Sequence, residues 1–178
     1  NNKIVFLGRG HVGLEVLNGL LDMNNVDISM IFICEGSVEV GFCDKAFQDI
    51  SSKHNIPIFF ENNINKDWIY EKLRRHSPDL MVAMLWLHTI NGNTVESSRL
   101  GILNLHAGDL PRYRGNACQT WAILNEEGKI GVSVHLMEGD SLDSGPVVLK
   151  KHIPVTSSTT VGELIGEVNR IGPGLVLE

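Results

Sequence analysis

The sequence is poor in cysteine and carries fewer basic than acidic residues. Its three cysteines, Cys34, Cys43 and Cys118, are odd in number and form no Cys-x-x-Cys pair. This pattern is typical of reduced, structural thiols in a cytoplasmic protein and not of a disulfide or zinc framework, so we expect no metal site. With 15 Lys and Arg against 21 Asp and Glu, the formal charge is −6. A nucleic-acid-binding surface is therefore not expected as the main function of this chain.

Long hydrophobic runs are also missing. No apolar stretch approaches the roughly 18 residues of a membrane-spanning helix, and no secretory segment precedes the first expected strand. We therefore expect a cytoplasmic protein with no membrane segment. The 178 residues are 43% hydrophobic and 20% charged, which is ordinary for a globular protein. A chain of this length is expected to form one domain that buries roughly 70% of its unfolded surface.

Short apolar runs alternate with helical patterns along most of the chain. This order predicts an α/β fold, Rossmann-like, with a mostly parallel sheet and helices on both faces. Ligands of such sheets bind at the carboxyl ends of the strands. Strands are expected at residues 3–7, 28–33, 56–60, 80–87, 102–106, 131–137 and 147–153, and helices at 12–21, 44–54, 67–75, 116–124 and after a capping Thr160.

The most informative stretch is the strand at residues 102–106. Alternation along a strand places Asn104 and His106 on one face and the two intervening leucines on the other. Asp143 lies 37 positions after His106 and could return as its carboxylate partner. An amide donor, an imidazole and a carboxylate together suit stabilising an oxyanion while moving a proton. Taken singly, each has an ordinary explanation: a core histidine, a strand cap, and a turn before Gly145.

A second motif competes with this interpretation. Residues 8–13 read Gly-Arg-Gly-His-Val-Gly, follow a predicted strand and open a predicted helix, and Glu35 ends the next strand. This is the spacing of a dinucleotide-binding turn, in which the pyrophosphate lies on the helix N-terminus. It would indicate an NAD(P)-dependent oxidoreductase. Tight strand–helix turns need glycine in any case, so the motif alone does not decide.

Four separated segments also carry a resemblance. They are Asn-x-His at 104–106, Leu-Pro-x-Tyr-Arg-Gly at 110–115, Gly-Val-Ser-Val-His at 131–135 and Leu-Asp-Ser-Gly-Pro at 142–146. In order and spacing they resemble the folate-dependent formyltransferases, which include the glycinamide ribonucleotide, methionyl-tRNA and nucleotide-amino-sugar enzymes. The resemblance covers nearly the whole chain. It departs at Gly108 and Asp109, where the family often has Ser and Leu.

The resemblance implies an N-formyltransferase whose donor is 10-formyltetrahydrofolate, with no metal. His135 is expected to be structural or to line the site. Asn104, His106 and Asp143 would be catalytic. The remaining implied contacts are Leu87, His88, Thr89, Ile90 and Asp140 for the folate donor, and Gly8, Gly10, His11 and Arg114 for the acceptor.

The acceptor is expected to be the amine of a nucleotide-linked amino sugar. Residues 8–13 lack the Gly-Ser-Asn pattern of the purine enzymes, and the loop after His106 looks closer to the amino-sugar enzymes. Methionyl-tRNA and glycinamide ribonucleotide are the alternatives. Because relatives commonly continue into a second domain, residues 1–178 are expected to be the catalytic domain of a longer chain. A homodimer formed through that missing region is compatible with this expectation.

Overall fold

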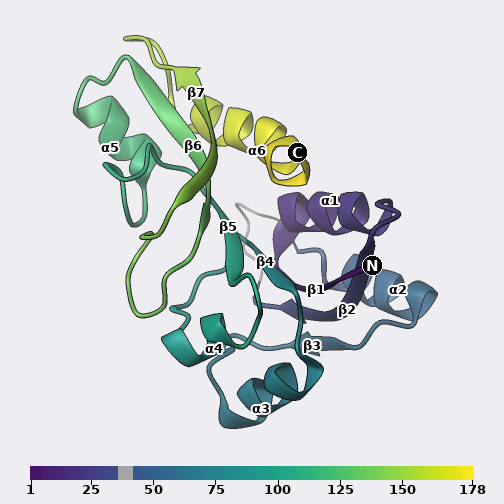
Figure 1. The fold of residues 1–178 in the computed structure, drawn as a ribbon. Coiled ribbons are helices and arrows are strands. Elements are labelled where there is room, and N and C mark those ends of the chain that lie inside the picture. The colour runs from purple at the N-terminus through teal and green to yellow at the C-terminus, as the bar shows by residue number, and fades with distance from the viewer. Residues whose placement is uncertain (36–41) are drawn as a thin grey trace.

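A seven-stranded sheet with the order β3-β2-β1-β4-β5-β6-β7 runs through the molecule (Figure 1). We describe it from a computed structural model, which covers residues 1–35 and 42–178. The five strands from β3 to β5 are parallel, whereas β6 is antiparallel to both β5 and β7. The expected α/β, Rossmann-like architecture with a mostly parallel sheet is thus confirmed.

Strands and helices follow one another in the order that the apolar runs predicted. The strands are β1 (Asn2–Gly8), β2 (Val26–Ile33), β3 (Ile58–Phe60), β4 (Leu80–Met84), β5 (Ile102–His106), β6 (Lys129–Leu136) and β7 (Val147–Pro154). The helices are α1 (Gly10–Leu21), α2 (Asp44–His54), α3 (Asp67–His76), α4 (Gly92–Glu96), α5 (Cys118–Leu124) and α6 (Val161–Leu177).

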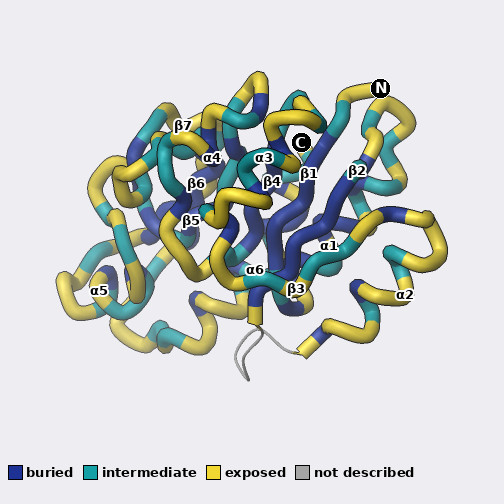
Figure 2. Tube along the Cα trace, turned by 90° about the horizontal axis from the view of Figure 1, so that it is seen from below, coloured by how far each residue is buried: buried dark blue, intermediate teal, exposed yellow. Residues whose placement is uncertain are grey.

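Helices cover both faces of the sheet because the central strands are apolar on both sides. In β1, Ile4 and Phe6 belong to one buried cluster, and Val5 and Leu7 belong to another. The first cluster joins the sheet to α1, α2, α5 and α6. The second joins it to α3 and α4. Figure 1 shows α1 and α6 side by side on one face and α3 and α4 on the other, and Figure 2 shows β1 and β2 buried along most of their length.

One expected element ends earlier than predicted, and one further element was not expected. The strand expected at 80–87 ends at Met84, because its neighbour β1 ends at Gly8, which pairs with Met84. Leu85 then adopts a positive φ of 58° and turns the chain out of the sheet. The short helix α4 was not expected, since five residues are too few to show a helical period. Its N-cap is Asn91, whose side chain accepts a hydrogen bond from the amide of Thr94.

The final helix was placed correctly from its first residue. Thr160 is its N-cap and forms a reciprocal capping box with Glu163, as Ser/Thr-x-x-Glu sequences do. Among the described residues, no helix combines the length and the apolar character needed to cross a membrane.

Candidate active site

The two polar residues of β5 lie on the same face of the sheet. Leu105 packs on the α6 side, against Gly172, and Ile102 belongs to the opposite cluster. Asn104 and His106 continue the face of Ile102, as the alternation of the strand predicted. Asn104 and His106 line a cavity to which neither α3 nor α4 contributes a residue. An uncovered strand face with polar side chains is therefore left beside the core.

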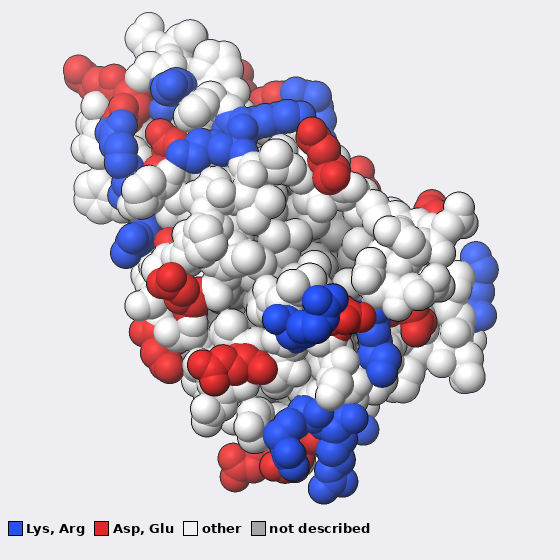
Figure 3. Space-filling view, in the orientation of Figure 1, with Lys and Arg blue, Asp and Glu red and all other residues white. Residues whose placement is uncertain are grey.

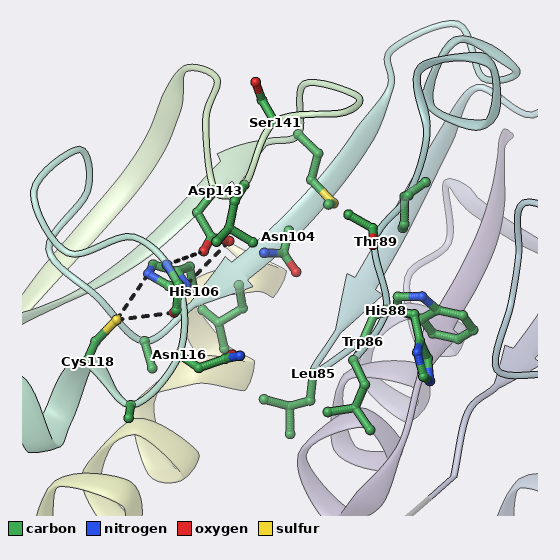
Figure 4. Close-up of a pocket in the computed structure, with 18 of the residues that line it drawn as sticks. Leu85, Trp86, His88, Thr89, Asn104, His106, Asn116, Cys118, Ser141 and Asp143 are labelled. Carbon is green, nitrogen blue, oxygen red and sulfur yellow. Dashed lines mark hydrogen bonds and ion pairs between the residues drawn. The ribbon is translucent and has the colours of Figure 1, made fainter.

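Two chain segments form walls over this uncovered face. One is residues 85–90, which leave the sheet after β4, and the other is the 137–146 loop between β6 and β7. Between them lies an open cavity of about 360 Å³. Such a volume is at the lower end of the range found for small-molecule sites. Its lining includes Arg9, residues 85–90, residues 104–107, residues 115–119, Met137 and residues 141–143 (Figure 4).

The cavity lies where an open α/β sheet is expected to bind ligands. The chain fills the sheet from β1 outward through β2 to β3, and then returns to place β4 and β5 on the other side of β1. The crevice between β1 and β4 is thus the point at which the strand order reverses. Arg9 follows β1 at this point. Its Nε donates a hydrogen bond of 2.7 Å to the carbonyl of Leu85, which ties the first turn to the wall after β4.

His106 is buried, and protein groups face both of its ring nitrogens. Nε2 lies 2.6 Å from the carbonyl oxygen of Tyr113. A carbonyl oxygen can only accept, so Nε2 carries a hydrogen and donates a hydrogen bond to it. Nδ1 faces Oδ1 of Asp143 at 3.6 Å. These two contacts, on opposite sides of the ring, fix the orientation of the imidazole.

Asp143 reaches the site from the 137–146 loop. Its Oδ2 accepts a hydrogen bond of 2.7 Å from the backbone amide of Gly115, so the carboxylate also holds the loop after β5. The 3.6 Å between Asp143 Oδ1 and His106 Nδ1 is longer than a direct hydrogen bond. A water molecule or a substrate group close to both atoms could exchange protons with either. Figure 4 shows Asn104, His106 and Asp143 side by side on one wall of the pocket.

Asn104 is held from the neighbouring strand. Its Nδ2 lies 3.1 Å from Nε2 of His135, which is directly opposite on β6. His135 is fully buried, and its Nδ1 lies 3.0 Å from the carbonyl oxygen of Ser144. Burial lowers the pKa of His135 below its usual range. His135 therefore lies behind the pocket wall and contacts Asn104, which lines the pocket.

Cys118 packs against the far side of the His106 ring. Its Sγ lies 3.6 Å from Nε2 of His106 and 3.4 Å from the carbonyl oxygen of Tyr113. Burial, with a smaller contribution from the charge of Asp143, raises the pKa of the Cys118 thiol to about 11. The group is accordingly a neutral thiol near pH 7 and fills space beside the imidazole, as a small apolar side chain would.

The residues expected to form the folate and acceptor contacts are divided by the structure. Residues 87–90 line the cavity together with Asn104, His106 and Asp143. Asp140 is exposed, and its Oδ2 accepts a hydrogen bond from the amide of Gly92, so it fastens the 137–146 loop to the chain after β4. The other expected contacts, Gly8, Gly10, His11 and Arg114, are absent from the lining residues.

Other lining residues were not singled out from the sequence. Arg9 lies between Gly8 and Gly10 in the first turn and lines the cavity, although no motif predicted a contact for its side chain. Asn116 and Gln119 carry no spacing signal and line the cavity only through the folding of the chain after β5.

The departure from the family pattern at Asp109 has a structural consequence outside the cavity. Asp109 Oδ1 lies 2.8 Å from Nζ of Lys150 and 3.3 Å from Nε2 of His152, both on β7. Lys150 also bonds the carbonyl of Leu110. Asp109 therefore pins the loop after β5 to the edge strand, and it is not among the residues that line the cavity.

Buried Ser133 holds the same loop from below. Its hydroxyl donates to the carbonyl of Gly108 at 2.8 Å and accepts from the amide of Leu110 at 3.3 Å.

In the part of the chain that the structure describes, no three His, Cys, Asp or Glu side chains are arranged to hold a metal ion.

A sequence model described as formyl transferase matches residues 2–177. Among curated relatives, a methionyl-tRNA formyltransferase of Clostridioides difficile (strain 630) is 27% identical over 172 residues, which are 96% of this chain and 55% of that protein. A methionyl-tRNA formyltransferase of Clostridium beijerinckii is 34% identical over 120 residues, or 67% of this chain and 39% of that protein. The chain thus spans about half the length of the curated relatives it matches.

Solved structures share the fold. A phosphoribosylglycinamide formyltransferase from Bacillus halodurans aligns with a TM-score of 0.75 at 15% identity, over 99% of this chain and 94% of that one. A sugar 3N-formyl transferase, solved in the presence of dTDP and 5-N-formyl-THF, aligns with a TM-score of 0.73 at 18% identity, over 98% of this chain and 60% of that one.

Proposed function

The chain belongs to the formyl transferase family, and from this we propose that it transfers a formyl group from 10-formyltetrahydrofolate to an amine. The observation that carries the proposal is the convergence of Asn104, His106 and Asp143 on one cavity, beside the wall formed by residues 87–90. The donor brings its own activated formyl group. The protein therefore has to position the amine, stabilise an oxyanion and move one proton.

In the proposed reaction, the lone pair of the acceptor amine attacks the formyl carbon and forms a new C–N bond. The carbonyl oxygen becomes an oxyanion, to which Asn104 donates a hydrogen bond from Nδ2. A single donor of this kind contributes about 3–4 kcal/mol to the stability of a transition state. His106, held between two acceptors, adds a positive charge nearby.

The intermediate then breaks down when the bond from the formyl carbon to N10 of the folate is cleaved. The acceptor amine loses one proton and N10 gains one, so the transfer needs a group that can accept and return a proton. Asp143 is suited to this role, because it lines the cavity and its Oδ1 stands 3.6 Å from Nδ1 of His106. Residues 87–90 are suited to hold the pterin ring, since they form the wall opposite these groups.

For the acceptor we propose a nucleotide-linked amino sugar. Arg9 lines the cavity at the reversal point of the sheet, and a guanidinium is a natural partner for a phosphate group. The neighbour crystallised with dTDP has this fold and acts on a sugar. Gly8, Gly10 and His11 surround Arg9 in the first turn, so a phosphate bound there would lie close to them. Arg114 is exposed and would contact only the more distant part of the acceptor.

Methionyl-tRNA is a second candidate, because the curated relatives named above carry that activity in their names. Recognition of several phosphates needs clustered Lys and Arg. In the view of Figure 3, these side chains stand in separate groups with Asp and Glu beside them, and the formal charge is −6. The catalytic domain 1–178 would then need a basic surface from another part of the protein.

Two measurements test the proposal. Formylation is measured with a panel of nucleotide-linked amino sugars, methionyl-tRNA and glycinamide ribonucleotide; turnover confined to methionyl-tRNA would overturn the sugar assignment and leave the transfer chemistry standing.

Thermal unfolding is measured with 5-formyltetrahydrofolate and, as a control, NAD. A ligand at about 100 times its Kd stabilises the fold by about 2.7 kcal/mol, a rise in Tm of roughly 5–10 °C. A rise with NAD and none with the folate would indicate an oxidoreductase instead.

A further inference from the structure

His135 is a fully buried polar residue on the strand beside the catalytic residues. Register places it directly opposite Asn104 on the antiparallel strand, so the two side chains project from the same face. Its ring stands edge-on to that of His106, with centroids 6.4 Å apart. It is not among the residues that line the cavity, and any effect on the reaction must therefore pass through a neighbour.

The hydrogen bonds of His135 determine which of its nitrogens carries the proton. Nδ1 lies 3.0 Å from the carbonyl oxygen of Ser144. A carbonyl oxygen accepts and never donates, so the hydrogen is on Nδ1. In a neutral ring, Nε2 is then an acceptor. The partner at 3.1 Å from Nε2 is the Asn104 amide, and only its NH₂ group can donate to that nitrogen.

The orientation of the Asn104 amide follows from this tautomer. One hydrogen of Nδ2 is used by His135, and the second is free for a group bound in the cavity. The flipped amide would place its oxygen against the lone pair of Nε2. It would also present an acceptor to the oxyanion, which needs a donor. The flip becomes favourable only if His135 is doubly protonated. Full burial opposes that state, as does the nearby His106, although Asp143 and the Ser144 carbonyl favour it.

We propose that His135 is a positioning residue for formyl transfer, which fixes the Asn104 amide with its free N–H directed to the oxyanion. This rests on the function proposed above. The donor and acceptor pattern runs from the Ser144 carbonyl through the His135 ring to Asn104. Because Ser144 directly follows Asp143, one loop supplies the carboxylate for His106 and the carbonyl that sets His135.

The backbone at Gly145 makes this arrangement possible. Gly145 has a φ of +97°, and a Cβ on it would overlap the carbonyl oxygen of Leu136. Only glycine allows the loop to return so closely that the Ser144 carbonyl meets the buried ring.

A pair of substitutions separates positioning from a merely structural role. In His135→Gln, an amide oxygen can occupy the place of Nε2 and accept from Asn104. In His135→Asn, the amide can replace Nδ1 toward Ser144, but nothing accepts from Asn104. His135→Asn is expected to lower kcat by about tenfold or more, with KM for both substrates within about twofold. His135→Gln is expected to recover most of that loss. The matched control is His54→Asn, because His54 is an exposed histidine at the end of α2. This substitution should not change kcat.

A double-mutant cycle tests whether the effect passes through Asn104. If it does, His135→Asn added to Asn104→Ala lowers kcat no further, since there is no amide left to orient. A second reduction of the same size in the double variant, or equal losses in the Asn and Gln variants, would overturn the proposal. Wild-type kcat in His135→Asn would do the same.

The tautomer itself is measured by ¹⁵N NMR of the histidine rings in the full chain. The expected result is a neutral His135 protonated on Nδ1. The measurement needs no acceptor substrate. A ring protonated only on Nε2, or on both nitrogens near pH 7, would contradict the proposed orientation. If Asn104→Ala keeps full turnover, the proposed chemistry fails; if Asn104→Ala loses turnover while His135→Asn keeps it, only the positioning role fails.

Discussion

Replacing Asp143 by asparagine removes one negative charge from the pocket and almost none of its volume. We expect Asp143→Asn to lower kcat by about a hundredfold while KM for the folate donor changes little. The amide oxygen can still accept from the backbone amide of Gly115, as Oδ2 does now at 2.7 Å. The loop should therefore keep its place, and the loss should come from the missing charge and the missing proton acceptor.

The magnitude follows from the geometry. Oδ1 of Asp143 stands 3.6 Å from Nδ1 of His106, and the two side chains are only 13% and 9% exposed. At this separation and an effective dielectric constant of about 20, an ionised Asp143 attracts the protonated form of His106 by about 5 kcal/mol. Part of this attraction offsets desolvation, and hydrogen bonds to charged groups contribute about 1.5–3 kcal/mol net. The upper part of that range corresponds to about a hundredfold in rate.

The assay is steady-state formyl transfer with the acceptor that the panel identifies, followed by unfolding in denaturant to confirm that the variant is folded. Asp79→Asn is the matched control. Asp79 also accepts hydrogen bonds from the backbone amide of Lys3 and from the side chain of Arg99. It lies just before β4, at the end of the strands away from the pocket. It should lose some stability and keep its turnover. A folded Asp143→Asn protein with kcat within about fivefold of wild type would refute the reasoning.

Three further predictions concern the loops and the thiol. Gly145→Ala should destabilise the fold and lower kcat, because the new Cβ overlaps the Leu136 carbonyl; unchanged stability in denaturant would contradict this reading. Cys118 should resist iodoacetamide near pH 8 until the protein unfolds, since burial raises the pKa of its thiol to about 11; mass spectrometry measures the modification, and rapid labelling of the folded protein would count against it. Burial alone would raise the pKa of Asp109, but its hydrogen bond to Lys150 holds that pKa below the usual range. The ion pair therefore stabilises the folded state above the unfolded pKa of about 3.9. This stabilisation is lost as the pH falls through the lower pKa of the folded state. Asp109→Asn should thus cost about 1 kcal/mol near pH 7 and much less near pH 3; equal losses at both pH values would exclude this ion pair as the cause.

The local spacing of residues determined much of the fold and part of the site. Successive side chains of a strand point to opposite faces, so the sequence alone placed Asn104 and His106 together and Leu105 toward the core. The helix after Thr160 could also be located, because a capping box is a local pattern of four residues. The apolar run at 80–87 was misjudged at its end, since the length of β4 depends on where β1 stops and not on its own composition.

Only the tertiary structure decided how distant segments meet. Nothing in the spacing of residues 131–146 reveals that β6 runs antiparallel to β5, with His135 opposite Asn104. Nor does it reveal that the following loop brings Asp143 to His106 and the Ser144 carbonyl to His135. The pairing of β5 with β6 and the path of the loop depend on packing and on close backbone contacts between residues far apart in the chain, such as Gly145 against the carbonyl of Leu136. The sequence thus determined which face carries the side chains proposed to be catalytic, and the folded chain determined which partners orient them.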